Sequence, residues 1–225
     1  MVSDWTRHME KALKRCAGHR SNHEAWQDFA IMSASELAAP FGLDGPLRDD
    51  AERVRDKYDD GEMEAMSEML GCVVGALDEN PRQDFLGAAY MELGIGNKKD
   101  GQFFTPYAAC EAMACASVDA DGCERAIAES GYVSLSDPAC GGGATLIAGA
   151  NRLRELGVDQ HHAWFEAQDL NLETACMCYV QLSLLGCAGV VIVGDTLAME
   201  RRRVLHLPMN VISPWWTARA LKEAV

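Results

Sequence analysis

The 225-residue chain is short of positive charge, with 20 Lys and Arg against 34 Asp and Glu and a net charge of −14. A protein that binds DNA by itself usually presents a basic face that neutralises phosphates. This chain would be repelled by phosphate over most of its surface. If it acts on DNA, a local basic strip or a basic partner subunit must hold the duplex.

Long apolar segments are also missing. Hydrophobic residues make up 48% of the chain, enough for a core, but no run of about 18 apolar residues could span a bilayer. Residues 1–5 lack the basic-then-apolar order of a secretory signal. We therefore expect a cytoplasmic protein without membrane association. Its length suits one domain, or one domain with a small appendage.

Paired cysteines are absent as well. The nine cysteines are scattered, and no two are spaced as Cys-x-x-Cys. Cys176 and Cys178 fall in a helical pattern, where residues two apart face different ways. We expect reduced, structural cysteines and no metal site.

A glycine-rich turn is the motif around which the rest of the sequence is organised. Residues 137–143 read Asp-Pro-Ala-Cys-Gly-Gly-Gly, between a predicted strand at 131–136 and a predicted helix at 144–153. Strand, acidic residue, glycine turn and helix are typical of a nucleotide-binding crevice. The spacing is not G-x-G-x-x-G, and no Lys-Ser or Lys-Thr follows to make a phosphate loop. The turn therefore favours a ligand with an adenosine and an amino acid over a polyphosphate.

Residues 1–97 are predicted to form a helical region and residues 98–225 an α/β core. Apolar residues recur at helical spacing over 5–16, 26–32, 52–77 and 84–94, with Pro and Gly breaks near 40–46. The methionines at 63, 66 and 69 are interpreted as core filler rather than a ligand groove. The acidic run at 56–62 is interpreted as a solvated turn, because it lacks the alternation of a calcium loop.

A helix start is predicted at the beginning of the core. Thr105 is a good N-cap and Pro106 suits the first helical position, so a helix is expected over 107–118. The free N–H groups of such a start could hold a carboxylate. An ordinary cap beside two core phenylalanines explains the same residues.

Strands and helices alternate after the glycine turn. Further strands are predicted at 163–168, 189–193 and 210–212, with helices at 172–186 and 217–225. This order indicates a mostly parallel sheet that is buried on both faces. Asp137, Asp169 and Asp195 follow the first three strands, so we expect them at the edge where open α/β sheets bind ligands.

Three carboxylates at one edge suit S-adenosyl-L-methionine (SAM). One can take the ribose hydroxyls, one the adenine amine and one the ammonium group, and an acidic pocket favours the cationic sulfonium. The alternative is that each Asp is a helix N-cap.

Four segments together resemble the N6-adenine DNA methyltransferases, most of all the modification subunits of type I restriction-modification systems and their phage and plasmid relatives. They are residues 102–106 (Gln-Phe-Phe-Thr-Pro), 137–143, 168–171 (Gln-Asp-Leu-Asn) and 194–197 (Gly-Asp-Thr-Leu). The resemblance implies a Rossmann-like class I SAM-dependent methyltransferase core behind a helical N-terminal region. It also implies DNA as a partner, held through a specificity subunit that the helical region would meet.

The same resemblance implies which residues bind SAM. Thr105 and the helix start after it would hold the methionine carboxylate, and Asp137 with Gly141 would contact the rest of the methionine. Asp169 would take the ribose and Asp195 the adenine. The expected cofactor-binding residues are Phe104, Thr105, Pro106, Asp137, Pro138, Ala139, Gly141, Gly143, Asp169, Leu170, Asp195 and Thr196.

The family's catalytic motif is an Asn, Asp or Ser, then two prolines and an aromatic residue. Its first side chain and the next backbone carbonyl accept hydrogen bonds from the target amine, and its aromatic ring stacks on the flipped base. Ser213, Pro214, Trp215 and Trp216 stand at that place, with Trp215 where the second proline is expected. Simple packing of these rings against the end of the sheet is the alternative.

Two functions remain open. The first is a DNA methyltransferase acting on adenine N6. The second is a catalytically degenerate SAM-binding relative with a regulatory or anti-restriction role through a partner subunit. The acidic composition and the early end of the chain, where the family continues for several more strands, favour the second. A methyltransferase for proteins or small molecules fits this set of motifs less well.

Overall fold

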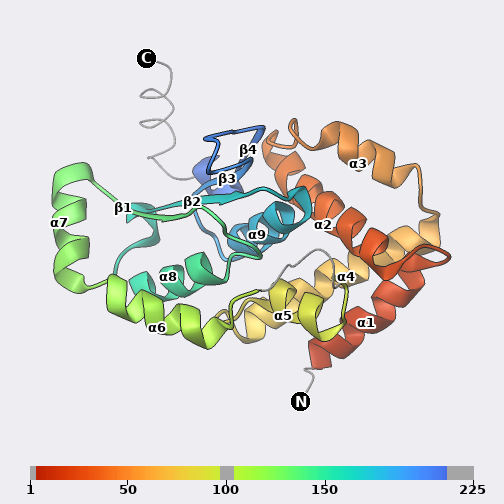
Figure 1. Cartoon of the computed structure of the whole chain (residues 1–225), viewed down its shortest axis with the longest axis horizontal. Coiled ribbons are helices and arrows are strands. Elements are labelled where there is room, and N and C mark those ends of the chain that lie inside the picture. Colours follow the sequence, from red (N-terminus) through yellow and green to blue (C-terminus); the bar gives the residue numbers. More distant parts are fainter. Residues whose placement is uncertain (1–3, 97–103, 212–225) are drawn as a thin grey trace.

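The computed structural model describes residues 4–96 and 104–211. Residues 4–96 form helices joined by turns (Figure 1). These are α1 (Asp4–Ala17), α2 (Asn22–Ala38), the 3₁₀ helix η1 (Ala39–Phe41), α3 (Arg48–Arg55), α4 (Asp60–Glu79) and α5 (Phe85–Glu92). Buried side chains from α1 onward belong to the same hydrophobic cluster as the strands. The division into two regions at residue 97 therefore stays a prediction.

The helical stretch expected over 52–77 is divided into two helices, because the acidic run that was interpreted as a turn ends α3 and starts α4. The Asp59 carboxylate accepts from the Glu62 backbone N–H at 2.8 Å, and the Glu62 carboxylate accepts from the Asp59 N–H at 3.1 Å. This reciprocal capping begins α4 and separates it from α3. Among the described residues, no group of three His, Cys, Asp or Glu side chains could hold a metal ion. All nine cysteines are free, and eight are buried.

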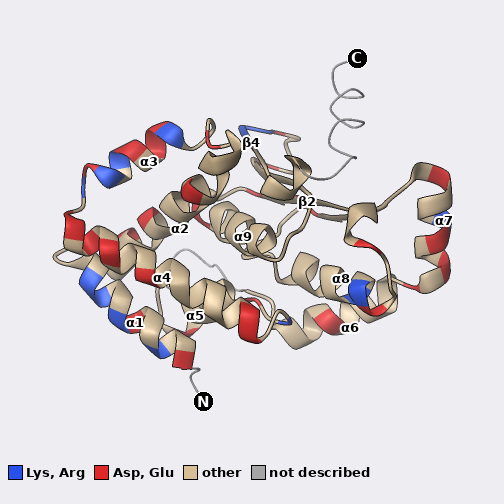
Figure 2. Cartoon of the chain, turned by 180° about the vertical axis from the view of Figure 1, so that it is seen from behind, with Lys and Arg blue, Asp and Glu red and all other residues tan. Residues whose placement is uncertain are grey.

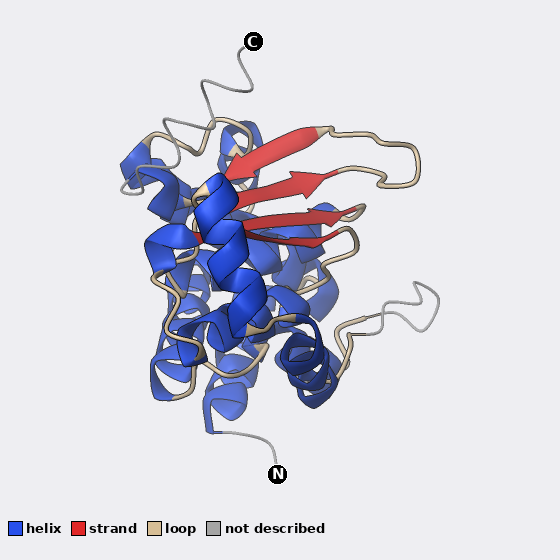
Figure 3. Cartoon of the chain, turned by 90° about the vertical axis from the view of Figure 1, so that its left-hand side faces the viewer, coloured by secondary structure: helices blue, strands red, loops and turns tan. Residues whose placement is uncertain are grey.

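The remaining elements form a layered α/β fold. They are α6 (Tyr107–Ser117), α7 (Ala120–Ser130), β1 (Val133–Asp137), α8 (Ala144–Glu155), η2 (Gln160–His162), β2 (Ala163–Asp169), α9 (Leu172–Leu184), β3 (Gly189–Val193), β4 (Arg203–His206) and η3 (Pro208–Val211). The strand order is β1-β2-β3-β4, with β1, β2 and β3 parallel. Figure 3 shows these three strands pointing one way and β4 pointing back. The α/β fold with a mostly parallel sheet is thus confirmed, although α7 was not expected.

The predicted fourth strand at 210–212 is wrong within the described residues. The observed fourth strand is β4, which pairs antiparallel to β3, and residues 208–211 form a 3₁₀ helix. The buried Asn210 side chain takes the place of a strand: its Oδ1 accepts from the Gly189 N–H at 2.6 Å, and its Nδ2 donates to the Gly189 carbonyl at 2.7 Å. These bonds fasten residues 208–211 to the first residue of β3, at the amino edge of the sheet.

Helix α9 occupies the middle of the molecule (Figure 1). All residues from 173 to 182 are buried, because one side of the helix packs on β2 and β3 and the other on α2, α4 and α5. Trp26 of α2 donates its indole N–H to the Met177 sulfur at 3.4 Å and meets Phe29 and Tyr90 edge-on. No helix within residues 4–96 and 104–211 is long and apolar enough to cross a membrane.

Replacement of Asn210 by Ala is expected to lower the free energy of unfolding by about 1–3 kcal/mol, because the buried Gly189 N–H loses its partner. Urea denaturation measures the change. Asn22→Ala is the matched control, since Asn22 is exposed at the start of α2. Equal stability of the two variants would show that the Asn210 bonds do not support the sheet.

Candidate functional site

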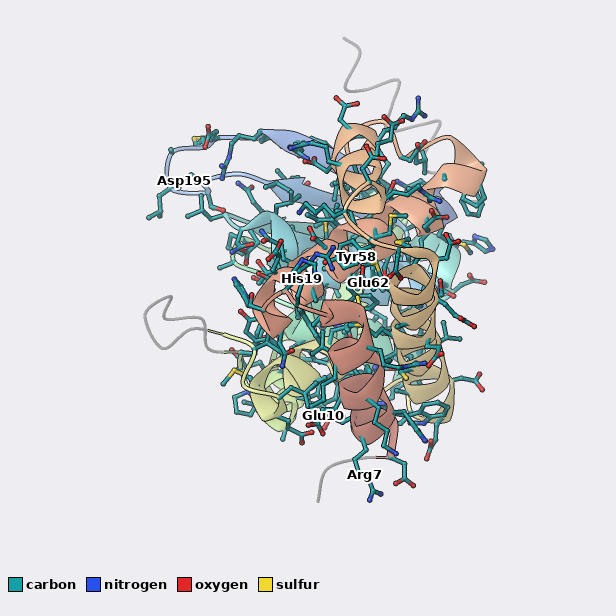
Figure 4. All side chains as sticks on the ribbon, turned by 90° about the vertical axis from the view of Figure 1, so that its right-hand side faces the viewer. Arg7, Glu10, His19, Tyr58, Glu62 and Asp195 are labelled. Atoms are coloured by element: carbon teal, nitrogen blue, oxygen red, sulfur yellow. The ribbon has the colours of Figure 1, made fainter. Side chains whose placement is uncertain are left out.

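The three strand-end carboxylates lie at the same edge of the sheet, as predicted. Asp137 pairs in register with Ala167, and Asp169 with Val193. Asp169 follows Ala167 by two residues, and Asp195 follows Val193 by two. Each carboxylate therefore stands two residues further along the strand direction than the carboxylate of the preceding strand. Asp195 lies in the loop between β3 and β4 that projects beyond the sheet (Figure 4).

The glycine turn after β1 has a backbone that favours glycine at two positions. Gly141 and Gly143 have φ values of +52° and +98°, a region that favours residues without a Cβ. A Cβ on Gly141 would lie 3.2 Å from the Phe104 ring, and a Cβ on Gly143 would lie 2.9 Å from the Cys178 sulfur. The turn is thus packed closely between Phe104 on one side and α9 on the other.

Hydrogen bonds from three loops hold this turn in one shape. The Gly141 N–H donates to Asp169 Oδ2 at 2.9 Å, and the Thr196 hydroxyl donates to the Pro138 carbonyl at 2.6 Å. The Ala139 N–H donates to Asp137 Oδ1 at 3.0 Å. The loops after β1, β2 and β3 are therefore fastened to one another, and a ligand at this edge would meet a preformed rim.

The carboxylates are not the N-caps of the following helices. The N-cap of α8 is Gly143 and that of α9 is Asn171, so the capping alternative is wrong for Asp137 and Asp169. Asp195 precedes a turn rather than a helix, where its Oδ1 accepts from the backbone N–H groups of residues 197 and 198.

The three carboxylates differ in the acceptor capacity that they leave for a ligand. Asp169 accepts from the N–H groups of Gly141 and Asn171 and from the Thr174 hydroxyl, so three of its acceptor positions are occupied by the protein. Every bond of Asp137 and Asp195 to the described residues goes to Oδ1. Their Oδ2 atoms meet no donor within that part of the chain and can accept from a ligand.

The predicted cap at the start of α6 is wrong by one residue. Pro106, with ψ 131°, is the N-cap, its side chain makes no capping bond, and Tyr107 is the first helical residue. Thr105 is exposed and does not cap the helix. With Phe104 and Pro106 it lines a pocket of about 310 Å³ that Asp84 and part of α5 complete. The hydroxyl and the first N–H groups of α6 thus remain available beside the glycine turn.

The expected catalytic residues Ser213, Pro214, Trp215 and Trp216 lie outside the described residues. Among the predicted binding residues, Leu170 follows Asp169 and leaves 59% of its surface exposed at the edge, where it can cover an apolar ring. The edge thus offers apolar surface beside its acceptors.

Two buried polar residues next to the turn escaped the sequence analysis. Asp84 caps α5, and Gln181 of α9 donates to Asp84 Oδ1 at 2.7 Å and to the Gly142 carbonyl at 2.8 Å. Burial raises the pKa of Asp84. Asp84 and Gln181 stand 97 positions apart in the sequence, so their hydrogen bond exists only in the folded chain.

The glycine turn, the parallel strands and the acidic carboxyl edge define an α/β protein of the kind that binds ligands at the carboxyl edge of its sheet. A comparison with protein families matches residues 83–217, more than half of the chain, to the N-6 DNA methylase family. The chain belongs to this family, which confirms the resemblance that the four motifs indicated. Membership indicates DNA methyltransferase activity, and members of the family generally depend on SAM. A comparison with curated proteins found no match.

Gly143→Ala is expected to lower the free energy of unfolding in two ways. The left-handed backbone costs about 1–2 kcal/mol, and the contact with Cys178 adds about 1–3 kcal/mol of overpacking. Gly157→Ala is the matched control, because its φ is +74° and no atom lies within 4 Å of the added Cβ.

Urea denaturation of both variants and of the double variant Gly143→Ala with Cys178→Ala separates the two causes. The second change removes the clashing sulfur, so it should cost less stability in the Gly143→Ala background than it does in the wild type. A Gly143→Ala variant no less stable than Gly157→Ala would contradict the close packing of the turn.

Proposed function

We propose that the chain binds SAM in the crevice along the carboxyl ends of β1, β2 and β3, and that it methylates N6 of adenine in DNA. One observation carries the proposal: three strand-end carboxylates surround a rigid glycine turn inside the segment that matches the N-6 DNA methylase family. The expected setting is the cytoplasm.

The donor set of the crevice fits SAM. The Oδ2 atoms of Asp137 and Asp195 can accept from the ammonium group and the adenine amine, and Asp169 retains room for a ribose hydroxyl. Thr105 and the first N–H groups of α6 suit the methionine carboxylate. The negative edge attracts the cationic sulfonium, and hydrogen bonds already hold the glycine turn in one shape before a ligand binds.

The proposed reaction needs position and electrostatics rather than a covalent intermediate. SAM, when bound, would supply an electrophilic methyl group: the N–CH3 bond would form as the S–CH3 bond breaks, with S-adenosylhomocysteine as the leaving group and one N6 proton released to water. The Ser213 hydroxyl oxygen and the Pro214 carbonyl accept hydrogen bonds from the target amine and direct its lone pair toward the methyl group. Trp215 and Trp216 supply the aromatic surface for the flipped base.

DNA binding through a partner specificity subunit agrees with the charge distribution. Figure 2 shows Lys and Arg on α1, on α3 and beside β4, each close to acidic residues. The densest arginine run is already neutralised: Arg201 pairs with Glu166 at 4.0 Å, Arg202 pairs with Glu200 at 3.4 Å, and Arg203 pairs with an acidic residue of α3. We therefore infer that the basic surface for DNA comes mainly from a partner.

Asp195→Asn is expected to weaken SAM binding by about 10- to 100-fold. Asn retains the oxygen that accepts from residues 197 and 198 but places a donor where the adenine amine needs an acceptor. Isothermal titration with SAM measures the change. Asp119→Asn is the matched control, because Asp119 accepts a backbone N–H at the start of α7. Unchanged affinity of the Asp195 variant would remove Asp195 from the adenine site.

Ser213→Ala is expected to slow methyl transfer to adenine by about 10- to 100-fold, because the target amine loses one acceptor in the transition state. SAM affinity should not change. Transfer of labelled methyl groups to DNA, in the presence of a specificity subunit, measures the rate. A variant that transfers methyl groups as fast as the wild type would exclude Ser213 from the mechanism.

A second function, SAM binding without catalysis in a regulatory or anti-restriction role, is favoured by one observation. Asn210 fastens residues 208–211 to the amino edge of the sheet, whereas the strand-end carboxylates lie at the carboxyl edge. Residues 210 and 211 therefore lie in a 3₁₀ helix at the amino edge rather than in a strand directed toward the carboxyl edge. SAM binding with no transfer to any DNA, with or without a specificity subunit, would support this second function over the first.

A further inference from the structure

Gln181 is a buried side chain that uses three of its hydrogen-bonding positions on two separate parts of the chain. It is fully buried in α9. Its Nε2 donates to the Gly142 carbonyl at 2.8 Å and to Asp84 Oδ1 at 2.7 Å, and its Oε1 accepts from the Leu86 N–H at 3.1 Å. One side chain thereby joins the first turn of α5 to the glycine turn.

Asp84 does more than its role as the cap of α5 requires. It accepts from the Gly87 N–H at 2.8 Å, which an uncharged Ser or Thr cap would do equally well. Instead a carboxyl group stands 95% buried, where charge is unfavourable. Its two oxygens lie 2.9 Å from the position of a Cβ on Gly142, so it forms the floor directly beneath the turn.

The glycine turn is therefore held from two sides at neighbouring peptide groups. Asp169 takes the Gly141 N–H at the strand edge, and Gln181 takes the Gly142 carbonyl from inside the protein. Three successive glycines have more backbone freedom than any other tripeptide, so without these bonds the turn would occupy many conformations. A ligand that needs one of them would then bind more weakly.

We propose that Gln181 and Asp84 are positioning residues that set the glycine turn for the adenosyl cofactor and couple α5 to cofactor affinity. The inference rests on the proposed function, because it takes SAM as the ligand of the turn. It goes beyond that function, because neither residue is among those proposed to contact SAM: Gln181 is fully buried behind the turn, and Asp84 lies 95% buried at the wall of the pocket beside Thr105. Their effect is exerted through the Gly142 carbonyl and has no preference for the charge on the ligand.

The test compares Gln181→Leu with Asn210→Ala by isothermal titration, using SAM and the product S-adenosylhomocysteine, which lacks the sulfonium charge. Gln181→Leu should weaken both ligands by the same factor, about 5- to 30-fold, as the freed turn must be ordered on binding. Asn210→Ala loses a buried amide at the opposite edge of the sheet, so it should lower stability without a change in affinity. Asp84→Ala removes the acceptor that the Gln181 amide and the Gly87 N–H share, so it should also weaken both ligands by one factor.

Gln181→Glu is the second variant if Gln181→Leu does not fold, because it preserves volume and the acceptor for Leu86 but cannot supply both donations. It should also weaken both ligands by one factor. Wild-type affinity in these variants would overturn the inference while leaving the proposed function intact. A loss confined to SAM would overturn it in favour of a charge effect. Failure of the wild type to bind either ligand would overturn the proposed function itself.

Discussion

The burial of α9 on every side is the constraint on which the rest of the structure depends. A helix that is apolar all round needs cover on all faces. The sheet supplies it on one side, and α2, α4 and α5 supply it on the other. The helical region is therefore part of the core that positions the site. Because Gln181 extends from the same helix to the glycine turn, packing in the middle of the molecule and geometry at its edge are set by one element.

The carboxyl edge combines two tasks in the same side chains. Asp169 holds the Gly141 N–H and the beginning of α9, and it also stands where a ribose is expected. A site built in this way is rigid before a ligand arrives, so little binding energy is lost to ordering. The arrangement also limits what substitution can reveal, since removal of Asp169 would alter the turn and the ligand contacts together. In Asp195, Oδ1 holds the loop and Oδ2 is left for a ligand, so a substitution there tests ligand binding more directly.

Local pattern was enough to predict the parts that local chemistry determines. A glycine and four apolar residues before a Gly-Asp pair predicted β3 with its observed bounds, and the glycine turn and the three aspartates were found by order alone. β4 was missed because Arg203–His206 has only four residues, two of them polar, and becomes a strand only by pairing with β3. The apolar stretch near Asn210 looked like a strand, but its amide side chain replaces strand pairing. The contact between Asp84 and Gln181 has no local signal, because it exists only in the folded chain.

The contact between Trp26 and Met177 spans 151 positions in the chain. At about 5–20 residues per second, a ribosome adds those residues in about 8–30 s. Throughout that interval α2 has been synthesised, but α9, the helix against which it packs, has not. In the incomplete chain, the indole and its apolar neighbours must pack against α1 and α4 or be bound by chaperones. The yield of folded protein in a cell therefore depends on whether the incomplete chain avoids aggregation until α9 has been synthesised.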